Sequence, residues 1–534
     1  MNPSGDELIQ VLKNLPAIQG AALLKELGSK SFPSGSKASF YGRMYAGAKQ
    51  SRLTSGWGQL TTSADSELST SLRILRSRSR QLIRDAPYAK RAKIIVVNNV
   101  IGAGIGMQAQ VKRPYKNVLD KEVNDGIESG FEDWCEASHC HTGGILHFAD
   151  IERIAMGQVF ETGEIFIRKH YREFGNSGIP FALEVIEPER VLDEFQPGAI
   201  VQNAVVRMGV ESDEFRRPLA YWIRRLHPGE IRFSAQETDR IERIPADQII
   251  HLRIVDRWPQ TRGEPWLHCV MRKLNDVDGY TEAEVVGARA AANYMATVET
   301  PQDYGELTET GSREIVLEPG IVERLSPGEK LNFISPNRPN TQIDPFVRLM
   351  LREVAAGTGP SYESLSRDYS QSNYSSSRLA LLDDRDLWRV FQLWFIRNFR
   401  DQIHREWLQQ AILSRAIPTI SIEEYASDIK KFTAVRFKPR GWTWIDPAKE
   451  VEAYKEGIKS GLTTMTKVIA STGDGMDIED VLDERRHELD LAKEKGLVFD
   501  TDPESVDFKK VKQPKVVTED GVKGKVINYS IPQR

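Results

Sequence analysis

The chain has 534 residues, of which 40% are hydrophobic and 28% charged, an ordinary balance for folded protein that at this length predicts roughly three or four substructures. Its 72 basic and 76 acidic residues leave a formal net charge of −4, which argues against a protein that grips DNA tightly, because such proteins usually carry a basic excess. No apolar run approaches the roughly 18 residues that cross a bilayer, and no secretion signal is recognisable, so we expect no membrane insertion. Three cysteines cannot form a disulfide framework, so we do not expect an oxidising compartment.

The N-terminal elements are an arm and a helix. Residues 1–60 include a Ser- and Gly-rich stretch and predict a mobile arm. A helix is predicted at 66–86, with a buried side made of Leu68, Leu72, Leu75, Leu82 and Ile83. The other face carries Arg73, Arg76, Arg78, Arg80 and Arg84. Such a face is more typical of ion pairing or a protein interface than of a DNA-contacting patch, although both interpretations stay open.

Between residues 93 and 252 the pattern changes to short apolar runs divided by Gly and Pro. These runs predict strands at KIIVVNNVIG, GEIFIRKHY, FALEVIEPERV, AIVQNAVVRMGV, LAYWIRR and QIIHLRIV. One helix is predicted within this region, at 117–137. The fold class that follows is α+β.

A long helix is predicted next, with Pro265 at its first position. Its apolar stripe consists of Leu267, Val270, Met271, Leu274, Val277, Val285, Ala288, Ala292 and Met295. A helix of this length measures roughly 50 Å. Residues 300–343, rich in Pro and Gly, predict short strands.

The segment from Asp344 to Arg415 predicts helix, break and helix. The first helix has one apolar face of Phe346, Val347, Met350, Leu351 and Val354 and ends in glycines. The break at 360–377 is rich in Ser, Tyr and Asn, whose side chains compete for backbone hydrogen bonds. The second helix is predicted to be capped near Ser375–Ser377 and to extend for about 55 Å. It carries Leu387, Val390, Phe391, Trp394, Phe395 and Phe399 on one side.

Beyond these helices the chain predicts three short helices and a tail. The helices are expected at 447–460, 464–471 and 478–495. Residues 496–534 have little capacity to form a core and predict an extended tail.

Two motifs suggest chemistry, but neither is well formed. VIGAGIGM at 100–107 has Met107 where a dinucleotide-binding loop needs its third glycine. The cluster of Cys135, His139, Cys140, His141 and His147 resembles a metal site, but its close spacing makes a tetrahedral zinc site awkward, so helix-end packing is favoured over metal binding. Nucleophile-elbow, zinc-protease and phosphate-loop motifs are missing from the sequence. We therefore expect no catalytic residue, no cofactor and no enzymatic activity.

The order of segments resembles the lambda-like portal family of tailed bacteriophages. The phrases that carry the resemblance are RSRQLIRDAPYAKRAKIIVVNNVIGAGIG, RIPADQIIHL, DRWPQTRGEPWLHCVMRKLNDVDGYTEAEVVGARAAA, VLEPGIVERLSPGEKLNF, AAGTGPSYESLSRDYSQSNYSSSRLAL and WIDPAKEVEAYKEGIKSGLTTMTKVIASTGDGMDIEDVL. No single phrase is decisive, but the ordered set covers most of residues 40–495. The resemblance implies a portal fold assembled as a ring, most simply a homododecamer.

The resemblance also implies a division of the chain into portal parts. These are an N-terminal arm (1–60), an α/β wing (61–264), a stem helix (265–299), a clip (300–343), a returning stem helix (344–359), a channel loop (360–377), a long helix with wing completion (378–446), a helical crown (447–495) and a C-terminal tail (496–534).

By resemblance, the function is a DNA channel at one capsid vertex, through which the genome is packaged, retained and ejected. A near-neutral charge is compatible with such a conduit, since tight contacts would oppose sliding. The implied partners are double-stranded DNA, the terminase large subunit, major capsid and scaffolding proteins and a head–tail connector, in a virion assembled in the host cytoplasm. Side chains of the loop that could line the channel are Tyr362, Arg367, Tyr369, Gln371, Asn373, Tyr374, Ser376 and Arg378.

Alternatives remain at this stage. The loop at 360–377 could be an ordinary surface connection whose Ser and Asn solvate the backbone. The chain could also be a metal-dependent nuclease or hydrolase with its site between Cys135 and His147, or a DNA-anchoring protein, which predicts strong salt-sensitive affinity.

Overall fold

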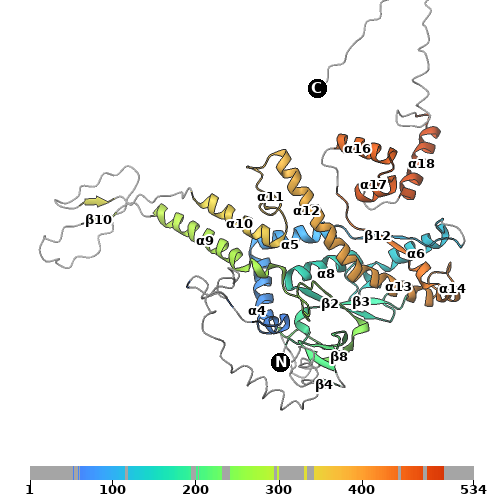
Figure 1. The fold of residues 1–534 in the computed structure, drawn as a ribbon, viewed down its shortest axis with the longest axis horizontal. Coiled ribbons are helices and arrows are strands. Elements are labelled where there is room, and N and C mark those ends of the chain that lie inside the picture. Colours follow the sequence, from blue (N-terminus) through green and yellow to red (C-terminus); the bar gives the residue numbers. More distant parts are fainter. Residues whose placement is uncertain are drawn as a thin grey trace, which may run out of the picture. The chain divides into compact units, whose positions relative to one another are not determined.

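The computed structural model describes residues 61–114, 118–193, 200–201, 204–230, 241–293, 297–299, 330–332, 342–442, 447–472 and 478–497, together with Arg52 and Gly58. The chain divides into two compact units, Met1–Thr62 and Ser63–Arg534, and every element below belongs to the second (Figure 1). The rest of the predicted arm at 1–60, and the tail beyond residue 497, lie outside the described residues. Among the helices described, none combines the length and apolarity needed to cross a membrane.

Two consecutive helices open the fold. Helix α4 (Ala64–Asp85) begins where the Ser63 side chain accepts a hydrogen bond from the Ser66 amide, and α5 (Pro87–Val100) begins at a proline. The strand predicted at KIIVVNNVIG is therefore wrong, because these residues form most of α5. Fully buried side chains recur along α5 at three- and four-residue spacing, namely Ala89, Ala92, Val96 and Val100. Tertiary packing thus overrides the β-propensity of the branched residues.

The sheets are small and antiparallel. A three-stranded sheet has the order β3-β2-β9, formed by Ala182–Ile186, Glu164–His170 and Ile249–Arg253. A five-stranded sheet runs in chain order from β4 to β8, formed by Ile200–Val201, Ala204–Arg207, Val210–Ser212, Pro218–Arg224 and Ile241–Pro245. A third pair joins β1 (Gly106–Ala109) to the distant β12 (Val435–Lys438). The other five predicted runs therefore do contain strands, and the α+β class is confirmed.

Three helices lie between β1 and β2 in the chain. Helix α6 (Lys121–Trp134) confirms the predicted one with shorter ends, and α7 (Ala137–Cys140) follows it. Helix α8 (Phe148–Thr162) was not predicted, and the expectation of a single helix in this region is wrong. Apolar side chains such as Ile151, Met156 and Phe160 are buried on several sides of α8, so the sequence lacks the one-sided stripe that marks a surface helix. The ranges η4 (Pro188–Arg190) and η5 (Ala246–Gln248) are short 3₁₀ turns.

The next segment is a pair of helices joined through short strands. The 3₁₀ turn η6 (Trp266–Cys269) leads into α9 (Met271–Asn293), so Pro265 precedes a 3₁₀ turn and not an α-helix. Strands β10 (Thr297–Glu299) and β11 (Lys330–Asn332) pair antiparallel, and α10 (Ile343–Thr358) returns. The rest of the predicted clip, and Met295 of the predicted stripe, lie outside the described residues.

A short helix and a long one follow. Helix α11 (Tyr362–Ser366) interrupts the predicted break, and then α12 (Tyr374–Phe395), the π-helical turn η7 (Ile396–Arg400) and α13 (Asp401–Leu413) run on without interruption. The predicted cap at Ser375–Ser377 is wrong by a few residues, because Asn373 caps α12. Val390, expected on the buried side, is 62% exposed, whereas Trp388 and Phe395 are buried.

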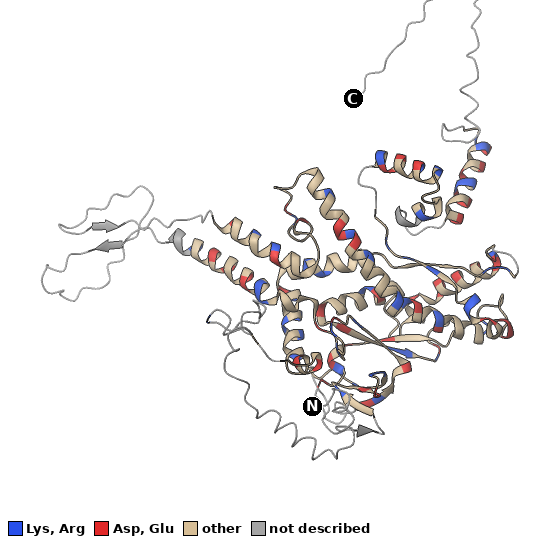
Figure 2. Cartoon of the chain, viewed as in Figure 1, with Lys and Arg blue, Asp and Glu red and all other residues tan. Residues whose placement is uncertain are grey.

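The remaining helices are short. They are α14 (Ile422–Ser427), α15 (Ile429–Phe432), α16 (Pro447–Lys459), α17 (Met465–Thr472) and α18 (Ile478–Glu494). The last three confirm the predicted C-terminal helices. Basic and acidic residues are interspersed along α9, α16 and α18 (Figure 2), which matches the near balance of charge in the whole chain.

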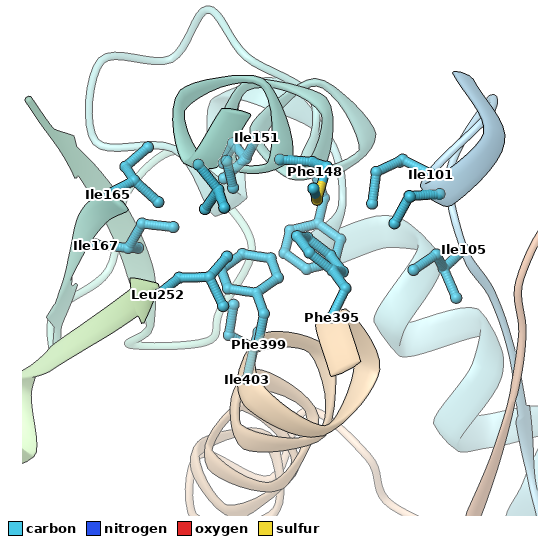
Figure 3. Packing of buried hydrophobic residues seen from close by; sticks show 14 of the residues in the cluster. Ile101, Ile105, Phe148, Ile151, Ile165, Ile167, Leu252, Phe395, Phe399 and Ile403 are labelled. Atoms are coloured by element: carbon cyan, nitrogen blue, oxygen red, sulfur yellow. The ribbon is translucent and has the colours of Figure 1, made fainter. Parts of the chain in front are cut away.

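The main core lies where the long helix meets the three-stranded sheet. In Figure 3, Phe395, Phe399 and Ile403 of the long helix point toward Ile165 and Ile167 of β2, with α8 above them. These five side chains are at most 1% exposed. Burial of so many large apolar groups fixes the long helix on the α/β body and so sets where its N-terminal half projects.

Candidate channel loop and base of the helical hairpin

Helices α9 and α10 form an antiparallel hairpin in one fixed register. The Tyr280 and Phe346 rings meet edge to face with centroids 4.9 Å apart. Closer to the base of the hairpin, Lys273 is ion-paired with Glu353. These two contacts are seven residues apart on both helices, so two turns of one helix match two turns of the other. The hairpin is therefore a defined unit that leads to the β10–β11 pair.

The hairpin closes tightly at its base. Trp266 Nε1 donates a hydrogen bond to the Thr358 carbonyl at 3.1 Å. A Cβ at Gly357 would overlap Val270 Cγ1, so only glycine lets the backbones approach this closely. Gly359 then ends α10 with φ of 103°, and the chain turns toward α11.

A buried charged cluster fixes the start of the hairpin to the sheet. Glu164, the first residue of β2, is fully buried and accepts hydrogen bonds from Arg262 Nε at 2.7 Å, His251 Nε2 at 2.8 Å and the Gly263 amide at 2.8 Å, and it is ion-paired with Arg76 of α4. Arg76, expected on the exposed face of α4, is thus buried, and this part of the basic face is ion-paired.

The charges around Glu164 determine its ionisation. Burial by itself would raise the pKa of Glu164, but the cations Arg262 and Arg76 outweigh burial and hold this pKa well below its ordinary value. Burial and the nearby Arg253 lower the pKa of His251 to about 3, so its ring is neutral. Arg262 also donates to three backbone carbonyls, those of Pro188, Leu192 and Met208. The cluster therefore joins both larger sheets to the segment that leads into the α9–α10 hairpin.

The first half of the loop is anchored by a carboxylate on α12. Asp384 accepts hydrogen bonds from the Ser361 amide at 2.9 Å, the Ser361 hydroxyl at 2.8 Å and the Ser364 hydroxyl at 3.2 Å. Burial raises the pKa of Asp384 although these hydrogen bonds oppose the rise. Arg91 of α5 donates to the Ser364 carbonyl at 3.3 Å. The loop is therefore pinned to both α12 and the body.

A second anchor involves Tyr362, one of the predicted channel residues. Its hydroxyl donates to Asp368 at 2.9 Å, and the Arg352 guanidinium lies 5.5 Å from its ring centre. Hydrogen bonds from Ser370 are the main cause that lowers the pKa of Asp368 to about 2, with Arg348 also contributing. Tyr362 is thus engaged inside the fold.

The remaining predicted channel residues fall into two groups. Asn373 and Ser376 form a reciprocal capping box at the start of α12, with the Ser376 amide 2.8 Å from Asn373 Oδ1. Five residues are exposed or half-buried on the outward part of the loop, namely Arg367, Tyr369, Gln371, Tyr374 and Arg378. Tyr369 is 58% and Tyr374 60% exposed. The outward group is the part of the predicted set that is available for contact.

Sequence reasoning missed the anchors themselves. Asp384, Glu164 and Arg262 were not singled out as site residues. Ser361 lies 23 residues from Asp384, and Arg262 lies 98 residues from Glu164. A helix-start signal at Ser361 was readable, but no local pattern identifies the distant carboxylates.

The Cys and His cluster has other partners. The Cys140 thiol donates to the Cys135 carbonyl at 3.3 Å, and the His147 ring accepts from the Ala149 amide at the start of α8. Burial raises the pKa of Cys140 to about 12, which disfavours the thiolate that zinc needs. Within the described parts of the chain, no group of three or more His, Cys, Asp or Glu side chains could hold a metal ion. The alternative of a metal-dependent nuclease therefore has no ligand set at this cluster.

Comparison with known proteins decides the family. A model of the phage portal protein, lambda family, matches residues 50–392. The chain belongs to the lambda family of phage portal proteins. Among its relatives, the probable portal protein of Halomonas phage phiHAP-1 is 28% identical over 85% of this chain and 88% of its own length. Portal protein B of Escherichia phage lambda and the portal protein of Escherichia phage N15 are 22% and 23% identical, each over 78% of this chain and 84% of their own.

Solved structures give a weaker match to this portal-family chain. The neck of a native gene transfer agent particle, computed with C12 symmetry, is 13% identical over 74% of the chain and 93% of its own, with a TM-score of 0.39. The neck of the empty particle, computed with C6 symmetry, has a TM-score of 0.40 at the same identity and coverage. These scores are too low to support an inference about assembly.

Proposed function

We propose that copies of this chain form a closed ring at one capsid vertex, and that the ring is the channel through which the viral genome is packaged, retained and ejected. The function follows from membership of the portal family. The observation that supports the ring most directly is the exposed apolar surface of α9, α10 and α12.

This surface lies on helices that already pack on one side. On the hairpin, Val285 is 48%, Phe346 42% and Leu349 54% exposed. Along α12 the exposed apolar residues are Leu379, Leu381, Leu382, Val390 and Leu393. Exposed apolar residues gathered on neighbouring helices mark an interaction surface. A head-to-tail contact between identical copies that closes on itself gives a ring.

We assign the helical hairpin, residues 265–299 and 344–359, to the stem, and residues 300–343 to the clip that docks the terminase motor and later the head–tail connector. Residues 61–264 and 378–446 form the wing, and 447–495 the crown. A dodecamer is the expected ring. Major capsid and scaffolding proteins surround the ring during assembly in the host cytoplasm, and the mature location is the virion.

The loop at 360–377 is proposed to face the DNA. Its outward residues Tyr369, Gln371 and Tyr374 are neutral and exposed, and Arg367 adds a single cation. Neutral polar groups give weak, exchangeable contacts to phosphate and sugar, which suits a duplex that must slide. The anchors at Asp384 and Asp368 hold the base of the loop, so that it resists the passing strand. The chain carries no nucleotide-hydrolysis motif in its sequence, so the terminase supplies the energy.

Electron microscopy of the purified full-length chain tests the ring. We expect annular particles with an open centre. Replacing Leu349 and Val285 by Asp should abolish them, whereas the same change at the exposed positions Ser71 and Thr70 of α4 should leave them intact. A chain that stays monomeric at all protein and salt concentrations would contradict the proposal.

A further inference from the structure

A cavity of about 900 Å³ lies between the end of α5, helix α12 and the segment that follows β12. Its lining includes four basic residues, Arg153, Arg385, Lys438 and Arg440, and no Asp or Glu. Trp442 and the glycines at 102, 104 and 106 complete much of the wall. A concentration of positive charge stands out in a chain whose net charge is −4.

The walls of this basic cavity are held by hydrogen bonds between distant segments. Gln392 of α12 donates to the Asn99 carbonyl at 2.9 Å and to the Arg440 carbonyl at 3.0 Å. Trp442 Nε1 donates to Asn99 Oδ1 at 3.1 Å. The three segments are thus joined to one another at Asn99, so the cavity is a fixed part of the fold.

Glycines position two of the cations. A Cβ at Gly102 would come within 3.1 Å of Arg440 Cδ, and a Cβ at Gly106 within 3.2 Å of Lys438 Cε. The bare backbone therefore lets the stems of Arg440 and Lys438 lie across the loop. This accounts for the glycine-rich sequence at 102–106, which does not form a dinucleotide-binding loop.

Two of the cavity arginines, Arg153 and Arg440, are held by uncharged acceptors. Arg440 donates to the Asn98 carbonyl at 2.6 Å, and Arg153 donates to the Gly102 carbonyl and, at 3.2 Å, to Asn98 Oδ1. These carbonyls lie at the C-terminal end of α5, which carries only about half a negative charge. Glu450 of α16 is close enough to Arg385 to oppose the fall in its pKa that burial causes, although Glu450 does not line the cavity. A guanidinium has five N–H donors, and Arg153 and Arg440 use only some of theirs in these hydrogen bonds.

We propose that this basic cavity binds phosphate groups of the DNA backbone. The choice of DNA as the source rests on the proposed function and on the continuity of α12 with the loop. Tyr374, Arg378 and Arg385 are four and seven residues apart, which places them on one face of α12. About 16 Å of helix separates the start of α12 from Arg385, roughly five base pairs of duplex. A strand that touches the loop can therefore continue along this face to the cavity. The strand would there meet the cavity wall formed by Arg385 and Trp442. The Arg385 guanidinium lies 5.8 Å from the centre of the Trp442 ring.

The test compares two charge-matched double variants of the full-length chain. Arg385→Gln with Arg440→Gln removes two cations from the cavity, and Arg397→Gln with Lys430→Gln removes two exposed cations elsewhere. Binding of a fluorescent 30-base-pair duplex is measured by anisotropy across salt concentrations. The cavity pair should weaken binding on the order of tenfold at low salt and reduce the salt slope by about two, and the control pair should change both far less. An equal loss in both pairs would overturn the proposal.

A second variant and a second probe complete the test. Lys438→Gln removes a cavity cation without removing a backbone anchor of Arg440 or Arg153, so it should weaken duplex binding by a few-fold even if the double variant folds poorly. Pyrophosphate should change the fluorescence of the wild-type chain but not that of Trp442→Phe. A response to pyrophosphate without a change in duplex affinity, or competition by polyglutamate alone, would overturn the assignment to DNA. Ring formation, scored by microscopy on the same samples, separates failure of this site from failure of the proposed function.

Discussion

The base of the α9–α10 hairpin and its outer half have opposite surroundings. At the base, Glu164 is surrounded by Arg76, Arg262 and His251 from three other segments, and the cluster is fully buried within one chain. Farther out, Val285 and Leu349 present apolar surface that the same chain does not cover. One subunit can therefore hold its body and the base of its hairpin by itself, whereas we propose that a neighbouring copy covers the outer surface of the hairpin.

Replacing Glu164 should have the largest effect on stability. Glu164→Gln leaves Arg76 and Arg262 buried without their counter-charge, and breaking a buried pair costs about 3–5 kcal/mol. The midpoint of chemical denaturation measures the loss. Glu67→Gln is the control, since Glu67 and Arg257 are both more than half exposed at 56% and 53%, and it should cost about 0–1 kcal/mol. Similar values for the two variants would mean that the cluster does not hold the base.

Acid should destabilise the body through two buried histidines, one in the Glu164 cluster and one in the main core. The pKa values of His251 and His404 are lowered to about 3, first by burial and then by Arg253 and Arg400. A histidine with a lowered folded pKa contributes its full stability above its ordinary pKa of 6.5 and loses it as pH falls toward 3. The free energy of unfolding should therefore fall by up to about 1.4 kcal/mol per pH unit for each histidine. His404→Phe should flatten this dependence between pH 6 and 4, and an unchanged slope would contradict it.

Closing the hairpin depends on one glycine. Gly357→Ala forces Val270 and α10 apart and should cost about 1–3 kcal/mol. In contrast, a Cβ at Gly279 of α9 meets nothing within 4 Å, so Gly279→Ala should stabilise by about 0.5–1 kcal/mol. Thermal denaturation of the two variants, with ring formation scored by microscopy, compares the tight base with the open helix. Equal shifts would disprove the close approach.

Freeing the loop should have a smaller effect that is confined to its surroundings. Asp384→Ala removes the acceptor for Ser361 and Ser364 and should cost about 1–2 kcal/mol. Hydrogen exchange of residues 361–366 should accelerate, while exchange in β2 should not. Asp383→Ala, one residue away and exposed, should leave both unchanged.

The exposed tyrosines should affect stability least. Tyr369→Ala and Tyr374→Ala should change the free energy of unfolding by no more than about 0.5 kcal/mol, because both side chains point outward. We expect them instead to weaken DNA retention in assembled particles. Tyr362→Phe loses the hydrogen bond to Asp368 and should show the opposite pattern. It should lower the free energy of unfolding by about 0.5–1.5 kcal/mol without changing DNA retention.

The sequence predicted the elements whose apolar residues lie on one side. The hairpin helices and the long helix have such stripes, and all were located, although the cap at Asn373 and the exposure of Val390 were not. Helix α5 was misread because its run of β-branched residues resembles a strand, and α8 was missed because it is buried on several sides and shows no one-sided stripe.

The site was predictable only in its local part. The loop was located because hydroxyl groups and Pro360 interrupt the pattern. Its anchors were not, because Asp384 and Arg348 act across the fold and a carboxylate on a helix looks like any other surface charge. The basic cavity combines Arg385 and Arg440 with Arg153, which lies more than two hundred residues earlier in the sequence. No short stretch of sequence could therefore reveal it.

The π-helical turn at Ile396–Arg400 has a further consequence. A wider turn accommodates one additional residue with almost no added length, and each residue rotates a helix by about 100°. Deleting one residue there would restore regular winding and leave Ile403, Trp407 and Ala411 facing the body. A deletion in the regular helix between this turn and those side chains would instead rotate all three by about 100°. A single-residue deletion should therefore be better tolerated within this turn than in α13.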